Sequence, residues 1–125
     1  MTLEEMTFFD DRPEELAIYA ALTERLADMG CEFNLRVQKT QISFYNRYLF
    51  ACVSFLRAKK KAELPPHFLT VTFGLGYPKS ADRIAVCTEA ARHRWTHHVV
   101  VGSAAEIDDE LMGWLKEAYD FSNSK

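Results

Sequence analysis

The chain has 125 residues, of which 48% are hydrophobic and 26% are charged, and its formal net charge at pH 7 is −3. This length and composition exclude an intrinsically disordered chain, and we expect residues 1–125 to form a single domain around one core. No run reaches the roughly 18 apolar residues that a membrane span needs, and the acidic N-terminus, MTLEEMTFFDD, does not resemble a secretory signal, so we expect a cytoplasmic protein.

The charges are unevenly distributed along the chain. Residues 1–32 contain two basic and nine acidic side chains, residues 33–67 contain seven basic and one acidic, and residues 68–125 contain six basic and eight acidic. The central block indicates either a basic binding surface or an acidic helix that lies beside basic strands. The sequence leaves both interpretations open.

The three cysteines, Cys31, Cys52 and Cys87, are far apart and form no CxxC pair. Their number and spacing support neither a disulfide framework nor a zinc knuckle. We expect three buried or half-buried thiols. Cys52 falls in the middle of an apolar run, so we expect it to be buried and a poor nucleophile.

The first helix is predicted to begin after Asp11-Arg12-Pro13. Proline is favoured in the first helical turn, and Asp11 is the expected capping residue. Gly30 is the expected stop. Phe8 and Phe9 precede this helix and are expected to fold back onto the core.

The middle of the chain changes to the two-residue period of strands. Alternation in 33–38, 41–45 and 68–75 predicts half-buried strands, and the apolar run 48–56 predicts a central strand. We expect 41–45 and 48–56 to form a hairpin, because Asn46-Arg47 is a plausible tight turn.

Further along the chain, Ile84 with Val86 and the segment 98–101 predict two more strands. The region 80–96 is also compatible with a helix. The last helix is predicted from the buried stripe of Leu111, Trp114, Leu115 and Ala118, with either Ser103 or Asp108 as its cap. The expected fold is α+β: a mostly antiparallel sheet of five or six strands flanked by an N-terminal and a C-terminal helix.

Three segments resemble a known family. They are FF at 8–9, LRVQKTQISFYNRYLFACV at 35–53, and HHVVVGSAAEIDDELMGWLKEAYDFS at 97–122, of which EID-x-EL-x2-WL-x2-AY is the most specific part. The chain resembles the bacterial domain of unknown function 5655 over nearly its whole length. The resemblance implies no catalytic residue. Because some members accompany endonuclease-like modules, it implies, by analogy only, a role related to nucleic acid.

The candidate binding residues are cations of the strand-rich region and its surroundings. Cations that neutralise phosphates, beside aromatic rings that stack on bases, are typical of nucleic-acid surfaces. The alternation also places Arg36 and Gln38 on one sheet face, which Thr70 and Thr72 would join. The alternative is an ordinary solvent-facing polar sheet side. We assign contacts with an anionic partner to Arg36, Lys39, Arg47, Arg57 and Arg83.

Other chemistry has weaker support. His93 and His97 would lie one turn apart on a helix, but no third ligand accompanies them at a diagnostic spacing. The acidic residues 108–110 are explained by the positive end of the last helix. Gly74 and Gly76 lack the third glycine of a dinucleotide loop. We therefore expect no metal, no cofactor and no recognisable catalytic residue.

The favoured hypothesis is a non-enzymatic binding or accessory module that engages nucleic acid or an acidic protein surface. The second hypothesis is a domain that forms a homodimer through a strand edge or aromatic face. An enzyme with an unrecognised site is the third, and it would require a concave site with convergent titratable groups.

Overall fold

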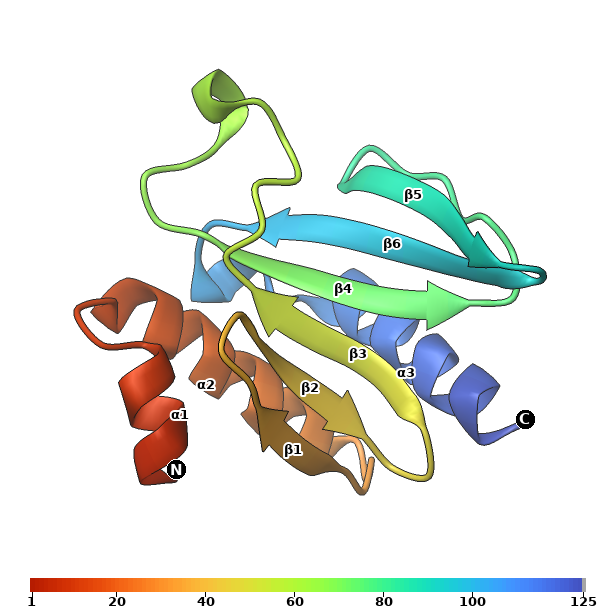
Figure 1. Ribbon diagram of the computed structural model, residues 1–125, viewed down its shortest axis with the longest axis horizontal. Helices are drawn as coiled ribbons and strands as arrows, with labels where there is room; N and C mark the ends of the chain where they lie inside the picture. Colours follow the sequence, from red (N-terminus) through yellow and green to blue (C-terminus); the bar gives the residue numbers. More distant parts are fainter. Residues whose placement is uncertain (125) are drawn as a thin grey trace.

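The computed structural model describes residues 1–124 and contains one six-stranded sheet (Figure 1). The strands follow the order β1-β2-β3-β4-β6-β5, and every neighbouring pair is antiparallel. Their bounds are β1 Asn34–Val37, β2 Gln41–Tyr45, β3 Leu49–Ser54, β4 Leu69–Leu75, β5 Ile84–Ala91 and β6 Arg94–Val101. The predicted α+β fold and the hairpin of 41–45 with 48–56 are therefore confirmed.

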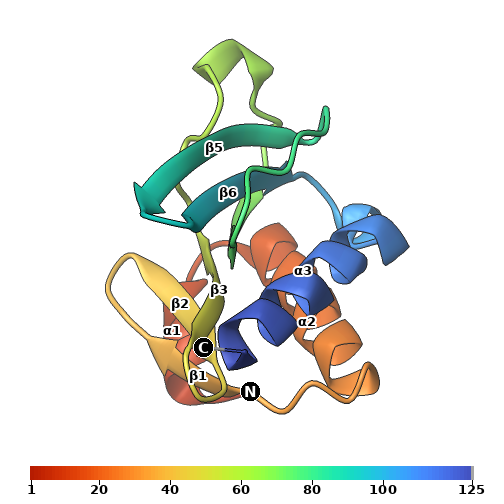
Figure 2. The ribbon, with the colours of Figure 1, turned by 90° about the vertical axis from the view of Figure 1, so that its right-hand side faces the viewer.

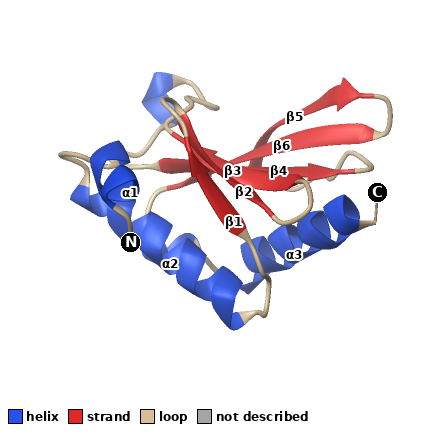
Figure 3. Cartoon of the chain, turned by 60° about the horizontal axis from the view of Figure 1, so that its bottom comes forward, coloured by secondary structure: helices blue, strands red, loops and turns tan. Residues whose placement is uncertain are grey.

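Three helices accompany this sheet: α1 (Leu3–Phe8), α2 (Pro13–Asp28) and α3 (Asp109–Asn123). Figures 2 and 3 show that α2 and α3 cover one face of the sheet, while the short α1 lies beside β1. The opposite face is turned toward the viewer in Figure 1, and no helix of residues 1–124 covers it. One side of the sheet is thus available to solvent or to a partner.

The helix that the sequence predicts after residues 11–13 is α2, and it begins and ends close to the predicted positions. Pro13 occupies the first turn, where its missing N–H costs nothing, and Gly30 takes the left-handed conformation (φ 78°) just after the helix. The prediction that Asp11 caps this helix is wrong. Asp11 itself adopts a left-handed φ of 59°, and the N-cap is Arg12, whose side chain makes no capping hydrogen bond.

The last helix is capped by Asp108 and not by Ser103. The Leu111 backbone N–H donates to the Asp108 carboxylate at 3.1 Å, whereas Ser103 precedes only a short 3-10 turn at Ala104–Glu106. The carboxylates of Asp109 and Glu110 occupy the first turn, where the helix dipole favours negative charge.

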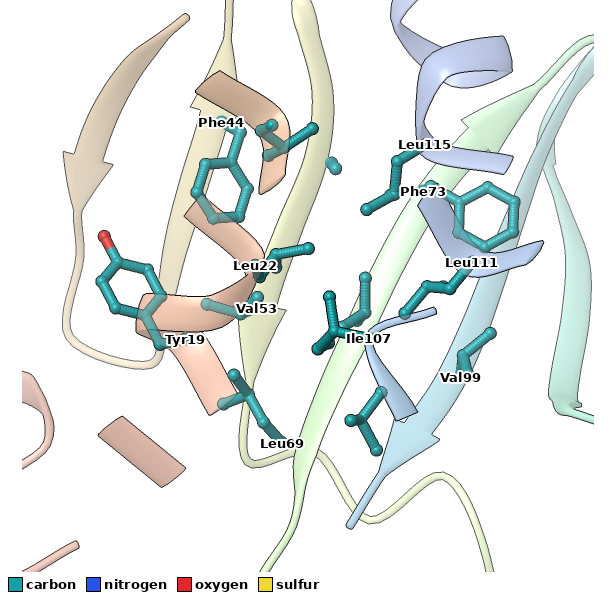
Figure 4. Close-up of a cluster of buried hydrophobic side chains, with 14 of the residues drawn as sticks. Tyr19, Leu22, Phe44, Val53, Leu69, Phe73, Val99, Ile107, Leu111 and Leu115 are labelled. Atoms are coloured by element: carbon teal, nitrogen blue, oxygen red, sulfur yellow. The ribbon is translucent and has the colours of Figure 1, made fainter. Parts of the chain in front are cut away.

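The core lies between the sheet and the two long helices (Figure 4). Phe44 of β2 and Tyr19 of α2 stack with ring centroids 6.2 Å apart, and Leu111 and Leu115 of α3 are fully buried against the sheet. Phe9 is 3% exposed and Phe8 packs against the core, as the sequence predicts for these two rings. These aromatic rings contribute large apolar surfaces to a core that is otherwise mainly aliphatic.

The region 80–96 contains strands and no helix. β5 and the first part of β6 form a hairpin, and His93 adopts a left-handed φ of 61° in its turn. β5 has register shifts at Ile84/Val86 and Glu89/Ala91, which interrupt the two-residue alternation of side chains. No helix among residues 1–124 is both long and apolar enough to cross a membrane.

Candidate functional site

The side that no helix covers, here called the open sheet face, has a chemical character that follows from the strand register. Side chains alternate between the two faces, and Ile42, Phe44 and Val53 point into the core. The intervening residues therefore line up on the other face. The paired positions that cross all six strands are Arg36, Ser43, Cys52, Thr72, His98 and Val86.

Two adjacent hollows occupy the open sheet face. The first has a volume of about 500 Å³ and is lined by Lys39, Thr40, Gln41, Cys52, Ser54, Phe55, Leu56, Thr72 and His98. The second has a volume of about 410 Å³ and is lined by Arg36, Gln38, Gln41, Ser43, Tyr45, Arg47, Tyr48 and Leu49. Gln41 borders both hollows, and neither lining contains an acidic side chain.

Three of the five predicted cations line the two hollows, and a fourth, Arg57, follows β3. Arg36 projects from β1, Lys39 lies in the β1–β2 turn, Arg47 lies in the β2–β3 turn, and Arg57 follows β3 next to Leu56. All four are exposed, and none forms an ion pair with a carboxylate of the described residues. No carboxylate of the described residues therefore neutralises these four charges at ion-pair distance.

The acidic residues lie elsewhere. Those of residues 1–32 belong almost entirely to α1, α2 and the turn between them, and α3 carries four of the remaining nine. Acidic helices thus cover one face of the sheet, and cations without an ion-pair partner among the described residues lie on the other side.

Two of the cations lie against aromatic rings. The Arg36 guanidinium carbon is 5.7 Å from the centroid of the Tyr45 ring, and that of Arg47 is 5.5 Å from the centroid of Tyr48. Both pairs border the second hollow. A guanidinium beside an exposed ring offers a charge for a phosphate and an apolar plane for a base or another flat group.

A polar network connects the two hollows. The Gln41 amide donates to the Ser43 hydroxyl at 2.9 Å, and that hydroxyl donates to the Gln38 amide oxygen at 2.8 Å. On the other side, the Thr72 hydroxyl and His98 Nδ1 are 2.7 Å apart. These side chains form an ordered polar floor that can donate to and accept from a ligand.

The environment of Cys52 and His98 favours their neutral forms. Cys31 is buried and Cys52 and Cys87 are half-buried, which agrees with the expected buried or half-buried thiols. Cys52 is less buried than its apolar run suggests, because its strand position alternates away from the core onto the open face. Burial raises the pKa of the Cys52 thiol, and a hydrogen bond with Thr72 offsets this only in part. Burial also lowers the pKa of His98, assisted by the neighbouring His97. Neutral groups of this kind suit hydrogen bonding better than nucleophilic catalysis.

The fifth predicted cation, Arg83, does not join the others. It precedes β5 and binds the start of α3: its guanidinium contacts Asp108 at 2.7 Å and Glu110 at 3.1 Å, and it donates to the Glu106 carbonyl at 2.7 Å. Burial opposes its charge, but the hydrogen bonds that it donates to these two carboxylates prevail and raise the pKa of Arg83. The role that this geometry supports for Arg83 is to join β5 to α3.

Replacing Arg83 with alanine is expected to lower the free energy of unfolding by about 1 kcal/mol, since one carbonyl and two carboxylates lose a partner at a partly exposed site. Urea denaturation of the variant beside the wild type measures this. An unchanged unfolding midpoint would show that Arg83 does not hold β5 and α3 together.

The two central histidines point to opposite faces, as alternation predicts. His97 is fully buried, its ring stacks on Phe73 with centroids 4.9 Å apart, and its Nε2 accepts from the Lys79 N–H at 3.0 Å. His93 lies in an exposed turn, so the structure does not bring His93 and His97 together. The pairing of Thr72 with His98 escapes sequence reasoning because 26 residues separate them, although alternation alone places each on this face.

The family model for a domain of unknown function, DUF5655, matches residues 5–122, from α1 to the end of α3. The chain belongs to this family. The match covers the whole sheet, so the open face is part of the DUF5655 domain itself. No curated protein and no solved structure matches the chain.

Proposed function

We propose that this DUF5655 domain is a non-enzymatic binding module that holds an anionic partner on the open sheet face, and that the partner is single-stranded nucleic acid. The observation that carries the proposal is the pairing of Arg36 with Tyr45 and of Arg47 with Tyr48 around a hollow without acidic side chains. A strand of nucleic acid presents phosphates to the cations and bases to the rings.

A single strand fits this face better than a duplex does. The aromatic rings lie at the surface of a sheet, where splayed bases can stack, whereas a duplex keeps its bases stacked on each other. The amides and hydroxyls of Gln38, Gln41 and Ser43 line the same hollow and are available to base edges or sugars. The net charge of −3 does not oppose this, because ten of the 18 acidic residues lie in α1, α2 and α3, none of which covers the open sheet face.

The test is fluorescence anisotropy of labelled single-stranded DNA and RNA, with duplex DNA as a comparison, over a series of salt concentrations. The wild type is expected to bind the single strands with an affinity that falls steeply with salt. Arg36→Gln should weaken binding and reduce the slope of log K against log salt by about 0.7, the value of one phosphate contact. Tyr45→Leu should lower the affinity by about 1–3 kcal/mol and leave the slope unchanged, because it removes only stacking.

Lys116→Gln is the matched control for charge. Lys116 lies in α3 in the helix layer, and its loss changes the net charge by the same amount as Arg36→Gln. Its binding curve should coincide with that of the wild type. Equal losses in Arg36→Gln and Lys116→Gln, or no binding at low salt, would contradict the proposal.

Homodimerisation is the second candidate function. β5 is an eight-residue strand at one end of the sheet, and an edge strand offers unpaired backbone groups to another strand. A light-scattering mass near twice 14.4 kDa, unaffected by salt, would favour it. A mass of 14.4 kDa at all concentrations would exclude it.

A further inference from the structure

A second cluster of side chains lies outside the open sheet face. Glu14 and Glu15 occupy the first turn of α2, and His67 lies in the loop before β4. One potential ligand atom from each residue lies within 4.8 Å of those from the other two. Glu14 and His67, together with Pro65, Pro66 and Gly102, line a hollow of about 300 Å³.

The Glu15 carboxylate is incompletely satisfied. Glu15 is 4% exposed, and its Oε1 is buried without any hydrogen-bond partner among the described residues. Its other oxygen, Oε2, lies 3.5 Å from His67 Nδ1, which is longer than a hydrogen bond. A buried carboxylate with a free oxygen is costly unless a charge compensates it.

The two separations that involve His67 are close to those around a metal ion. His67 Nδ1 lies 3.5 Å from Glu15 Oε2 and 3.6 Å from Glu14 Oε2. Two ligands bound to zinc at about 2.0–2.1 Å in a tetrahedral arrangement lie about 3.3 Å apart. The three groups therefore need only small movements to share one ion, and the exposed Glu14 side chain is free to make them.

We propose that Glu14, Glu15 and His67 form a binding site for a divalent transition-metal ion, with zinc as the best fit. Imidazole and carboxylate ligands suit zinc, whereas Mg²⁺ and Ca²⁺ take oxygen ligands almost entirely. Two carboxylates neutralise the ion, and three protein ligands leave one position for water or another ligand. Pro13 and the pair Pro65-Pro66 restrict the backbone beside the ligands.

The proposal is tested by calorimetric titration of Zn²⁺ into the intact chain after treatment with a chelator. We expect one saturable equivalent, with an affinity above that for Mg²⁺. Glu15→Gln and His67→Gln should each weaken Zn²⁺ binding by at least about tenfold, because even outer-shell partners of a metal are worth about 10–100-fold. Glu24→Gln, on the same helix, and His93→Gln, in an exposed turn, are matched controls that should bind like the wild type.

Two further measurements distinguish metal binding at this site from binding by the cysteines and from an effect of misfolding in the variants. Bound Co²⁺ should show no thiolate charge-transfer band, because no cysteine is among the proposed ligands. Zn²⁺ should raise the Tm of the wild type and leave that of Glu15→Gln unchanged, while the metal-free variant keeps a Tm at least as high as that of the wild type. Unsaturable binding, a cobalt–thiolate band, or wild-type affinity in Glu15→Gln or His67→Gln would overturn the proposal.

Discussion

Phe44→Ala is expected to lower the free energy of unfolding by about 3–5 kcal/mol, a large share of the stability of a domain of this size. Phe44 is fully buried on the helix-covered side of β2. Its ring stacks on Tyr19 and meets Phe33 edge-on, with centroids 6.2 and 5.8 Å away. Alanine leaves a cavity between sheet and helix that the rigid neighbouring rings cannot fill.

Arg36→Ala is the control for this prediction, since Arg36 lies on the other face of the same sheet. Its side chain is exposed and forms no ion pair with the described residues, so its loss should change the free energy of unfolding by less than about 0.5 kcal/mol. Urea denaturation of both variants measures the difference. A cost for Arg36→Ala close to that for Phe44→Ala would contradict the assignment of the two faces.

The asymmetry between the two faces explains how much of the fold the sequence predicts. Phe44 and Phe73 alternate with polar residues, so the period of two reveals both their strands and their buried side. Pro13 likewise marks the start of α2, because proline is compatible with the first turn and not with the interior. These signals are local, and they depend on a clear contrast between core and solvent.

Where that contrast is weak, the sequence leaves the structure undetermined. β5 is an edge strand whose side chains are half-buried or exposed, and two register shifts break its alternation. α1 has only six residues, too few for a helical period to be visible. Asp11 has the chemistry of a cap, but the chain turns there through a left-handed conformation and the helix begins one residue later.

The candidate sites also contain some features that the sequence predicts and others that it does not. Alternation places Arg36 and Thr72 on one face, and this is enough to predict a polar, cationic surface. The pairing of Arg83 with Asp108 and the approach of His67 to Glu15 depend on contacts between distant segments. Such contacts follow from how the helices pack on the sheet, which residue spacing does not encode.

Tyr19→Phe is expected to lower the free energy of unfolding by about 1–3 kcal/mol at pH 7, because it leaves a buried carboxylate oxygen without its donor. The Tyr19 hydroxyl donates to Glu5 Oε2 at 2.5 Å, and Glu5 is 6% exposed. Glu5 also closes a capping box with Thr2, whose backbone N–H donates to Glu5 Oε1 at 2.8 Å. This hydrogen bond therefore joins α1 to α2.

The cost of Tyr19→Phe should depend on pH. Burial alone raises the pKa of Glu5, but hydrogen bonds from the Thr2 backbone and from Tyr19 outweigh it, so the pKa of Glu5 lies below its usual value of 4.5. A lowered carboxyl pKa stabilises the fold above pH 4.5, and this contribution is lost as the pH falls through the folded-state value. Without the Tyr19 hydroxyl that contribution is smaller, so the difference between variant and wild type should shrink in acid.

The control is Tyr119→Phe, which removes a hydroxyl that donates to the neutral Glu32 carbonyl at 3.2 Å. Its smaller cost should be the same at pH 7 and pH 3.5, since no carboxylate is involved. Urea denaturation at both pH values gives the difference in free energy of unfolding between each of the two variants and the wild type. Hydrogen exchange of the α1 amides shows whether that helix detaches first in Tyr19→Phe. A cost of Tyr19→Phe that does not change between the two pH values would show that Glu5 is not the group this hydroxyl stabilises.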